Sequence, residues 1–371
     1  MLKTMFPRIN QESSMLGFGC MRLPCTAEGK IDEAEAIRMI RHAIDSGVTY
    51  IDTAYPYHGG ESELIVGKAL QDGYREKVVL ATKLPCWNVH CHEDMMKILD
   101  EQLTKLQTDH IDFYLMHAMN AQRLEEMQKY DYKSFLDEAL AQGKIRYPSF
   151  SFHDDYDAFM RILNDYDWKM AQVQMNILDD ENQATLEGIR ECGRCGVGVV
   201  IMEPLRGGLL ANPPADVKAV YEAFEDKRSP VEWAFRYLYA MPEVITILSG
   251  MSNWEQTTDN LRIFDLNERP VLTEAEHALF KQVKATYMAR TRTRCTGCEY
   301  CQPCPVEIKI PAIFRGYDQA AIFDNMEPFY ERYRKEFDAS VCAECGACEA
   351  ACPQHIAIRD MLKQIHAEAN A

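Results

Sequence analysis

The stretch LGFGCMRLPCTAEGKIDEAEAIRMIRHAIDSGVTYID, residues 16–52, has the pattern of a strand, a helix and a second strand. Asp32 is placed to cap the helix, and Gly47 follows its end. Ile40 and Ile44 recur with helical spacing, which predicts one buried helix face. Two strands joined by a helix in this order predict parallel pairing in a sheet.

The same alternation continues to about residue 263. The strand candidates are LGFG from Leu16, VTYID from Val48, VVLATK from Val78, IDFYLMH from Ile111, IRYPSFS from Ile145, AQVQM from Ala171, VGVVIM from Val197 and VITILSG from Val244. Eight strands alternating with helices favour a closed (β/α)8 TIM barrel, an α/β fold, over an open doubly wound sheet. No G-x-G-x-x-G follows the first strand, which also weighs against the open sheet.

The length of the chain predicts a second domain. It has 371 residues, whereas a βα barrel takes about 250. A helix expected over Thr273 to Ala289 leads into the basic linker RTRTR, Arg290 to Arg294, where the composition changes. We therefore expect a barrel domain over residues 1–289 and a small, mainly α-helical domain over residues 290–371.

Composition excludes several classes of partner. The formal net charge of −17 argues against a nucleic acid or an anionic membrane, because either would require a basic face. No apolar run reaches the about 18 residues of a membrane span. The N-terminal stretch MLKTMFPRINQESS lacks the apolar core of a signal peptide, so we expect a cytoplasmic protein. Its fourteen cysteines are then expected to be thiols or metal ligands.

Eight of these cysteines form two runs near the C-terminus. The runs are Cys295-x2-Cys298-x2-Cys301-x2-Cys304-Pro305 and Cys342-x2-Cys345-x2-Cys348-x3-Cys352-Pro353. The second matches the bacterial ferredoxin run C-x2-C-x2-C-x3-C-P, in which three cysteines hold one cubane and the fourth holds the other. The first run is one residue shorter before its last cysteine. Structural zinc is the alternative, although zinc sites favour paired C-x2-C segments.

The resemblance to ferredoxins implies two [4Fe-4S] clusters and a ligand set for each. Cluster one would take Cys295, Cys298, Cys301 and Cys352, and cluster two would take Cys342, Cys345, Cys348 and Cys304. The insertion between the runs is expected to contain a helix around Pro328 to Phe337.

Three segments resemble the signatures of the aldo-keto reductase family. They are IDTAYPYHGGESE from Ile51, ATK ending at Lys83 and LMH ending at His117, with Asp52 five residues before Tyr57. Together with the cysteine runs they resemble the subgroup with a C-terminal ferredoxin-like 4Fe-4S domain. This resemblance implies that Asp52, Tyr57, Lys83 and His117 are catalytic and lie at the C-terminal ends of barrel strands.

The chemistry of carbonyl reduction fits these residue types. A tyrosine of pKa about 10 is a reluctant proton donor unless a neighbouring cation lowers its pKa, and Lys83 would supply that cation. Asp52 would hold Lys83, and His117 would orient the substrate oxygen or share the proton transfer. Taken singly, Asp52 could be a helix cap, Lys83 a solvated strand end and His117 a core histidine. Tyr55 competes with Tyr57 as the donor, and the five-residue offset favours Tyr57.

The family resemblance also implies a nicotinamide site. Its residues would be Ser151 and Gln172 at the carboxamide; Gly19, Cys20, Met21 and Asp52 beside the nicotinamide ribose; Leu205 and Gly207 near the pyrophosphate; and Gly250, Ser252, Gln256 and Asn260 at the adenosine. Two positions depart from the family pattern, because Met202 replaces a stacking aromatic residue and Phe152 replaces an asparagine. No arginine or lysine occurs between Gly250 and Asn260 to clamp a 2′-phosphate. The cofactor is therefore NADH or NADPH.

Two smaller clusters have weaker claims to function. Cys86, His90, Cys91 and His92 follow Lys83 and are candidate metal ligands, but a loop that also carries Trp87 more often shapes a substrate pocket. The C-x-x-C spacing of Cys192 and Cys195 lies at a helix end that would not stabilise a thiolate. We expect both clusters to be structural.

The sequence thus predicts an oxidoreductase that reduces a carbonyl, or oxidises an alcohol, of a small molecule with a nicotinamide cofactor. Two [4Fe-4S] clusters would link it to a ferredoxin or flavoprotein partner. A nicotinamide-independent reductase fed by the clusters is one alternative, and a redox-sensing regulatory protein is another. The substrate itself cannot be read from these residues.

Overall fold

The computed structural model describes residues 1–293, 295, 301–352 and 355–371. Packing divides the chain into two compact units, Met1–Ala211 with Val231–Leu272, and Asn212–Pro230 with Thr273–Ala371. The second unit therefore includes helices that precede residue 290. The expected boundary after residue 289 was drawn from the change in composition before the cysteines, not from packing. It stays a prediction.

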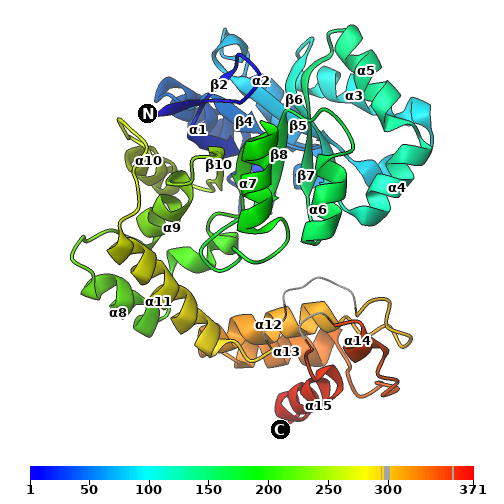
Figure 1. Cartoon of the computed structure of the whole chain (residues 1–371), viewed down its shortest axis with the longest axis vertical. Helices are drawn as coiled ribbons and strands as arrows, with labels where there is room; N and C mark the ends of the chain where they lie inside the picture. Colours follow the sequence, from blue (N-terminus) through cyan, green and yellow to red (C-terminus); the bar gives the residue numbers. More distant parts are fainter. Residues whose placement is uncertain (294, 296–300, 353–354) are drawn as a thin grey trace. The chain divides into compact units, whose positions relative to one another are not determined.

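The first unit contains a closed barrel of eight parallel strands in the order β10-β3-β4-β5-β6-β7-β8-β9 (Figure 1). The strands are β3 (Leu16–Gly19), β4 (Tyr50–Asp52), β5 (Val79–Leu84), β6 (Ile111–Met119), β7 (Ile145–Phe152), β8 (Met170–Gln174), β9 (Gly198–Met202) and β10 (Val244–Gly250). Each predicted strand is present, with bounds within two residues of the expected ones. The predicted barrel fold is therefore confirmed.

Helices connect the strands on the outside of the barrel, as Figure 1 shows. They are α1 (Glu33–Asp45), α2 (Ser62–Ala69), α3 (His92–Leu106), α4 (Ala121–Lys129), α5 (Tyr132–Ala141), α6 (Tyr156–Leu163), α7 (Thr185–Cys195), α9 (Pro230–Tyr239) and α10 (Trp254–Ile263). The side chain of Asp32 caps α1 by accepting a hydrogen bond from the Glu35 N–H, as predicted. The buried face of α1 includes Ile40 and Ile44.

A short N-terminal hairpin, β1 (Lys3–Met5) and β2 (Glu12–Ser14), precedes the barrel and was not predicted. Phe6 follows β1, is 1% exposed, and packs on Phe113 with a ring-centroid distance of 4.5 Å. A Cβ atom at Gly198 would lie 2.3 Å from the Phe6 ring, so only glycine fits there. Because Gly198 begins β9, Phe6 packs at the N-terminal end of the barrel.

The second unit is helical where the structure describes it. Its helices are α8 (Ala215–Ala223), α11 (Glu274–Arg290), α12 (Ile310–Ile322), α13 (Glu327–Glu336), α14 (Ala347–Ala350) and α15 (Ile358–Ala369). The helices expected near 273–289 and 328–337 correspond to α11 and α13. Thr273 caps α11 in a reciprocal pair with Glu276. No helix in the described ranges is long and apolar enough to cross a bilayer.

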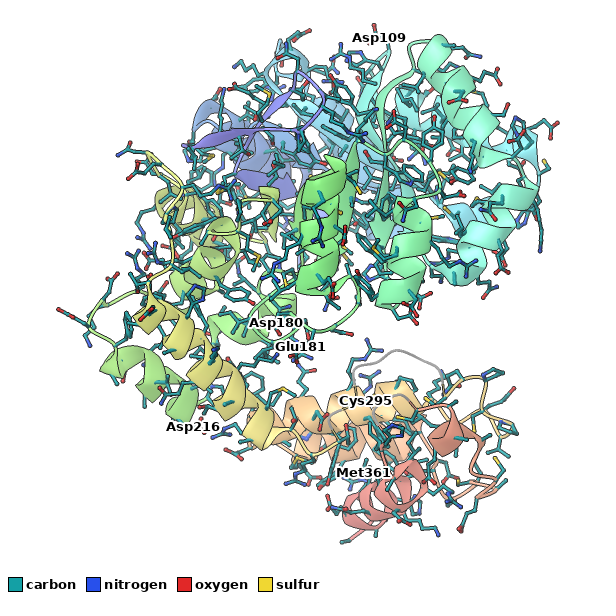
Figure 2. The ribbon with its side chains drawn as sticks, viewed as in Figure 1. Asp109, Asp180, Glu181, Asp216, Cys295 and Met361 are labelled. Atoms are coloured by element: carbon teal, nitrogen blue, oxygen red, sulfur yellow. The ribbon has the colours of Figure 1, made fainter. Side chains whose placement is uncertain are left out.

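An apolar core joins the helices of the cysteine-bearing segment. Phe314, Tyr333 and Leu362, from α12, α13 and α15, are all nearly inaccessible to solvent. Cys295 and Met361, labelled in Figure 2, pack against the same core. The cysteine loops are therefore carried on a packed helical scaffold.

Candidate active site

The four predicted catalytic residues lie on neighbouring barrel segments. Asp52 is the last residue of β4, Lys83 is next to last in β5, and His117 lies near the end of β6. Tyr57 begins the short 3-10 turn Tyr57–Gly60 that follows β4. All four therefore lie at the C-terminal end of the barrel, where barrel enzymes carry their chemistry.

Lys83 is the centre of this group. Its side chain is 1% exposed, and its Nζ donates to Asp52 Oδ1 at 2.7 Å and to the Thr53 carbonyl at 2.7 Å. The same nitrogen lies 3.4 Å from the Tyr57 hydroxyl. One ammonium group therefore holds a buried carboxylate and reaches the proposed proton donor.

The charges in this group follow from burial and from Lys83. Burial favours neutral Lys83, but Asp52 and Tyr57 outweigh it and raise the pKa of Lys83, which keeps the ammonium charged. Burial raises the pKa of Tyr57, and the charge of Lys83 opposes this shift without reversing it. The expectation that Lys83 leaves Tyr57 with a lowered pKa is therefore wrong for the protein without ligands. Tyr57 is protonated at neutral pH.

His117 is neutral in this environment. Burial, and then the positive charge of Lys83, lower the pKa of His117 well below its ordinary value. The His117 ring lies edge-on to Tyr57, with ring centroids 6.2 Å apart. Its Nδ1 is buried and has no hydrogen-bond partner in the described part of the chain. A neutral imidazole with an unused nitrogen next to the tyrosine can bind a substrate oxygen.

The structure also distinguishes the two candidate tyrosines. The hydroxyl of Tyr55 donates to the Glu101 carboxylate at 3.2 Å, and its ring lies under the Lys105 ammonium. Tyr55 therefore contacts the side chains of α3, whereas Tyr57 contacts Lys83. The geometry favours Tyr57.

The two residues expected at the carboxamide lie beside the catalytic group. Ser151 and Gln172 are each 2% exposed, at neighbouring positions of β7 and β8. Ser151 Oγ accepts from the Ala118 N–H at 2.7 Å, and Gln172 Nε2 donates to Asp52 Oδ2 at 3.4 Å. Gln172 Oε1 is buried and has no partner among the described residues. An amide ligand would satisfy this oxygen, so this pair fits a carboxamide.

The remaining expected cofactor residues also lie at or after the C-terminal ends of barrel strands. Gly19 ends β3 and Gly250 ends β10, and the others come after strands: Cys20 and Met21 after β3, Leu205 and Gly207 after β9, and Ser252, Gln256 and Asn260 after β10. Gln256 accepts from the Ser252 N–H, and Asn260 donates to Ser249, so both side chains have partners within their own segment.

Arg22 is a site residue that the sequence reasoning missed. The position of a Cβ atom at Gly250 is 3.3 Å from the Arg22 side chain, and that at Gly207 is 3.9 Å from its Nη2. Arg22 thus contacts two segments expected at the cofactor. The sequence could have indicated Arg22, because it directly follows Met21, a residue expected beside the nicotinamide ribose.

The Cys86 to His92 loop uses its side chains locally. Cys86 is buried with its thiol toward the Leu84 carbonyl, Cys91 caps α3, and the His92 ring contacts the Tyr130 carbonyl at 2.8 Å. Trp87 lies against the His117 ring, with centroids 5.0 Å apart. The loop therefore forms one wall beside the catalytic group. In α7, Cys192 is buried and its pKa is raised by burial.

The cysteine runs surround a separate cavity. It has a volume of about 220 Å³, and its lining includes Cys301, Cys304, Cys342, Cys345 and Cys348. All four cysteines expected to hold cluster two are among these residues, as is Cys301 of cluster one, so the crossover of Cys304 stays a prediction. Cys298 lies outside the described residues.

The other two described cysteines, Cys295 and Cys352, belong to or pack against the apolar core of the helices. Cys352 is 9% exposed. The backbone N–H of Cys295 donates a hydrogen bond to Thr293 Oγ1 at 3.1 Å. No three His, Cys, Asp or Glu side chains of the described chain gather closely enough to hold one metal ion. The thiolates of a cubane stand further apart than the ligands of one zinc ion.

Comparisons with known proteins found family profiles that match both parts of the chain. A family profile described as "Aldo/keto reductase family" matches residues 15–285, and one described as "4Fe-4S dicluster domain" matches residues 294–357. Aldo-keto reductase YhdN from Bacillus subtilis is 42% identical over 114 residues, which is 29% of this chain and 34% of that protein. The matched segment thus spans about a third of YhdN.

Longer matches cover about three quarters of this chain. The uncharacterized oxidoreductase YqkF from Bacillus subtilis is 27% identical over 73% of this chain and 93% of its own. The holo form of aldo-keto reductase AKR11C1 from Bacillus halodurans is 27% identical with a TM-score of 0.65, and the match covers 76% of this chain and 96% of that one.

Proposed function

Because the chain belongs to the aldo/keto reductase family, as an oxidoreductase with a C-terminal 4Fe-4S domain, we propose that it reduces a small-molecule carbonyl with NADH or NADPH. The reverse reaction would oxidise the corresponding alcohol. The observation that carries this proposal is the single Lys83 ammonium in contact with both Asp52 and Tyr57.

The catalytic residues would act at the carbonyl oxygen. His117 would donate a hydrogen bond that orients this oxygen, since its imidazole is neutral. The nicotinamide, when bound, supplies a hydride, which carries both electrons to the carbonyl carbon. The Tyr57 hydroxyl would give its proton to the resulting alkoxide, so the product is an alcohol. Lys83 would stabilise the phenolate left on Tyr57, and Asp52 would hold Lys83 in place.

The nicotinamide site is part of the proposal. Ser151 and Gln172 would hold the carboxamide, as the unused Gln172 Oε1 supports. Gly19, Cys20 and Met21 would line the ribose, and Leu205 and Gly207 the pyrophosphate. Gly250, Ser252, Gln256 and Asn260 would lie at the adenosine. Both NADH and NADPH remain candidates, because no cation follows Gly250 up to Asn260.

We further propose two [4Fe-4S] clusters in the domain of residues 290–371. Cys342, Cys345, Cys348 and Cys304 would hold one, and Cys295, Cys298, Cys301 and Cys352 the other. The shared cavity of Cys304 and the second cysteine run supports the first set. The clusters would exchange electrons with a ferredoxin or flavoprotein in the cytoplasm, where a reducing environment suits a chain with so many thiols.

The test of catalysis is a matched pair of variants, Tyr57→Phe and Tyr55→Phe, assayed with 4-nitrobenzaldehyde and either NADH or NADPH. Tyr57→Phe should lower kcat by about 10²–10⁴-fold, the usual contribution of a general acid. Tyr55→Phe, which loses only the bond to Glu101, should retain activity. Equal losses in the two variants would contradict the assignment.

A modified form of this assay separates the two alternative functions. With benzaldehyde, which has no nitro group for dithionite to reduce, turnover by dithionite-reduced clusters above the rate without protein, and without nicotinamide, would indicate a reductase fed by the clusters. Nicotinamide binding without turnover of any aldehyde would indicate a sensor.

The cluster assignment is tested by iron content. Anaerobically purified protein should contain about eight irons per chain, the content of two cubanes. Cys345→Ser should lose about half of them, whereas Cys195→Ser, at the exposed end of α7, should lose none. Stoichiometric zinc with negligible iron would reject both clusters.

A further inference from the structure

Arg123, in the first turn of α4, is a cation beside the active site that the mechanism above does not use. Its Cζ lies 5.3 Å from the centre of the Trp87 ring, and Trp87 lies 5.0 Å from the His117 ring. The positive charge of Arg123 is one of the causes that lower the pKa of His117. Arg123, Trp87 and His117 therefore form one continuous wall.

The guanidinium of Arg123 has unused donors. Its Nη1 donates to the Ala118 carbonyl, which holds the group in place. Its Nε and Nη2 have no hydrogen-bond partner among the described residues, and no described carboxylate lies within ion-pair distance. These two nitrogens form the edge of a guanidinium that binds a carboxylate or phosphate with two parallel hydrogen bonds.

No nearby acid forms an ion pair with this guanidinium in the described part of the chain. Glu126 accepts a hydrogen bond from the Gln122 side chain, and Asp154 accepts one from the Ala121 N–H. At the catalytic group, the charges of Asp52 and Lys83 compensate each other. Arg123 thus presents an unpaired guanidinium edge beside the site, in a chain whose net charge is −17.

We propose that Arg123 binds an anionic substituent of the substrate, so that the natural substrate is a carbonyl compound bearing a carboxylate or a phosphate. The proposal rests on the proposed carbonyl reduction, which it refines. Trp87, 42% exposed, would support the body of the substrate between the carbonyl at His117 and the anion at Arg123. An overall acidic protein repels anions at long range, so a local cation is what such a substrate requires.

The test uses three aldehydes of similar shape: 4-formylbenzoate, 4-formylphenyl phosphate and methyl 4-formylbenzoate. In the wild type, at least one anionic aldehyde should have a higher kcat/KM than the neutral ester, and the preferred anion identifies carboxylate or phosphate. Arg123→Leu should lower kcat/KM for that anion by about 10–100-fold and change it little for the ester, as expected for a lost charge-assisted hydrogen bond. Arg123→Lys, which keeps the charge but not the planar fork, should fall between.

Arg161→Leu is the matched control, because Arg161 is an exposed arginine on the neighbouring helix α6 and is paired with Glu125 of α4. It should leave all three rates unchanged. An equal loss of rate for the ester and the acids in Arg123→Leu would overturn the proposal, since Arg123 would then act only by holding the Ala118 peptide beside His117. Equal wild-type rates for ester and acids would also overturn it.

Binding separates this proposal from the proposed function. Titration calorimetry of the full-length protein with 4-(hydroxymethyl)benzoate, 4-(hydroxymethyl)phenyl phosphate and the methyl ester of the former needs no turnover. If an anionic alcohol binds more tightly than the methyl ester, and Arg123→Leu removes this difference in affinity, the subsite is supported even if no aldehyde is reduced. Turnover of all three aldehydes without any preference for anions would leave the reductase and reject the subsite.

Discussion

Asp52 and Asp112 are two buried carboxylates at opposite ends of the same barrel. Asp52 ends β4 and is 2% exposed, whereas Asp112 is the second residue of β6 and is 1% exposed. Both carry cationic partners at hydrogen-bond distance. What separates them is which side chains surround each carboxylate: two arginines pair with Asp112, whereas Asp52 shares its lysine with a tyrosine.

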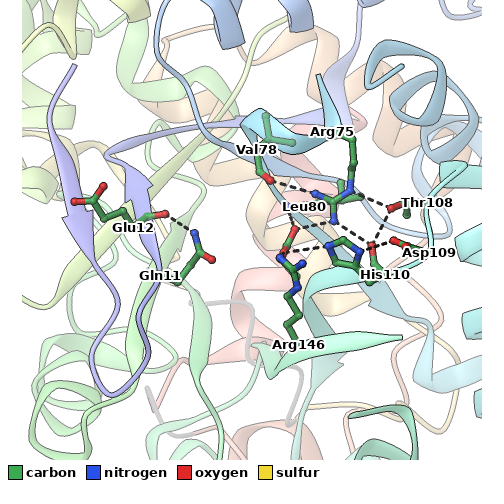
Figure 3. A network of polar contacts seen from close by, with 10 residues as sticks. Gln11, Glu12, Arg75, Val78, Leu80, Thr108, Asp109, His110 and Arg146 are labelled. Atoms are coloured by element: carbon green, nitrogen blue, oxygen red, sulfur yellow. Dashed lines mark hydrogen bonds and ion pairs between the residues drawn. The ribbon is translucent and has the colours of Figure 1, made fainter. Parts of the chain in front are cut away.

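The carboxylate of Asp112 forms the closed end, because each of its oxygens has an arginine partner, although the adjacent His110 Nε2 is buried without a hydrogen-bond partner among the described residues. The carboxylate accepts from Arg75 at 2.8 Å, from Arg146 at 2.7 Å and from the Leu80 N–H at 2.9 Å, which joins the starts of β5, β6 and β7. Figure 3 shows Arg75 and Arg146 converging on this point, with His110 next to them. Residues at this end of a barrel typically serve stability rather than chemistry.

The group around Asp52 is open by comparison. Lys83 contacts Asp52 and also reaches Tyr57, while His117 Nδ1 and Gln172 Oε1 are buried without partners in the described chain. Buried polar atoms without partners are costly, so a folded protein retains them where a ligand will satisfy them. The comparison indicates a binding site at one end and a structural clamp at the other.

The largest expected effect is on the open end. Lys83→Met should lower kcat/KM for aldehyde reduction by about 10²–10⁴-fold, because Tyr57 loses the cation that stabilises its phenolate. Since Lys83 lowers the pKa of Tyr57, the alkaline limb of the remaining activity should move to higher pH. Lys105→Met, which removes the cation over Tyr55, is the control. An unchanged pH profile in Lys83→Met would break the proposed link.

A smaller effect, on stability, is expected at the closed end. Asp112→Asn should reduce the free energy of unfolding by about 3 kcal/mol, because it leaves two arginines without their buried counter-charge. Urea denaturation measures this loss, and kcat/KM should be unchanged because Asp112 lies away from the catalytic end. Asp52→Asn should instead lower kcat/KM. Loss of activity at full stability in Asp112→Asn would contradict the division between the two ends.

The smallest effect concerns pH. The pKa of His117 is lowered on folding, so the unfolded chain binds a proton at this residue that the folded chain does not. Above the ordinary histidine pKa of about 6.5, His117 is neutral in both states and does not affect the free energy of unfolding. As pH falls below that value, the free energy of unfolding decreases by at most about 1.4 kcal/mol per pH unit. His117→Gln should therefore show a shallower loss of stability between neutral and acidic pH. Identical slopes would show that His117 is accessible to protons when folded.

Local patterns were sufficient for the parts of the fold that depend on neighbouring residues. The alternation of apolar runs predicted every barrel strand, and the Asp32 and Thr273 caps of α1 and α11 follow from short-range hydrogen bonds. The N-terminal hairpin was not predicted, because its two strands have only three residues each. Its anchor, Phe6, depends on space left at Gly198, almost two hundred residues away.

The sequence by itself determined the barrel, the iron-sulfur segment and the residue types of the catalytic group, because these are encoded in periodicity and spacing. The offset from Asp52 had favoured Tyr57 over Tyr55, but only the tertiary structure brought Tyr57 to Lys83 and Arg123, Trp87 and His117 into one wall. Burial also decided the direction of the Tyr57 pKa, which the residue types had suggested wrongly. These outcomes depend on how separate loops meet and how much water they exclude, and short-range patterns contain neither quantity.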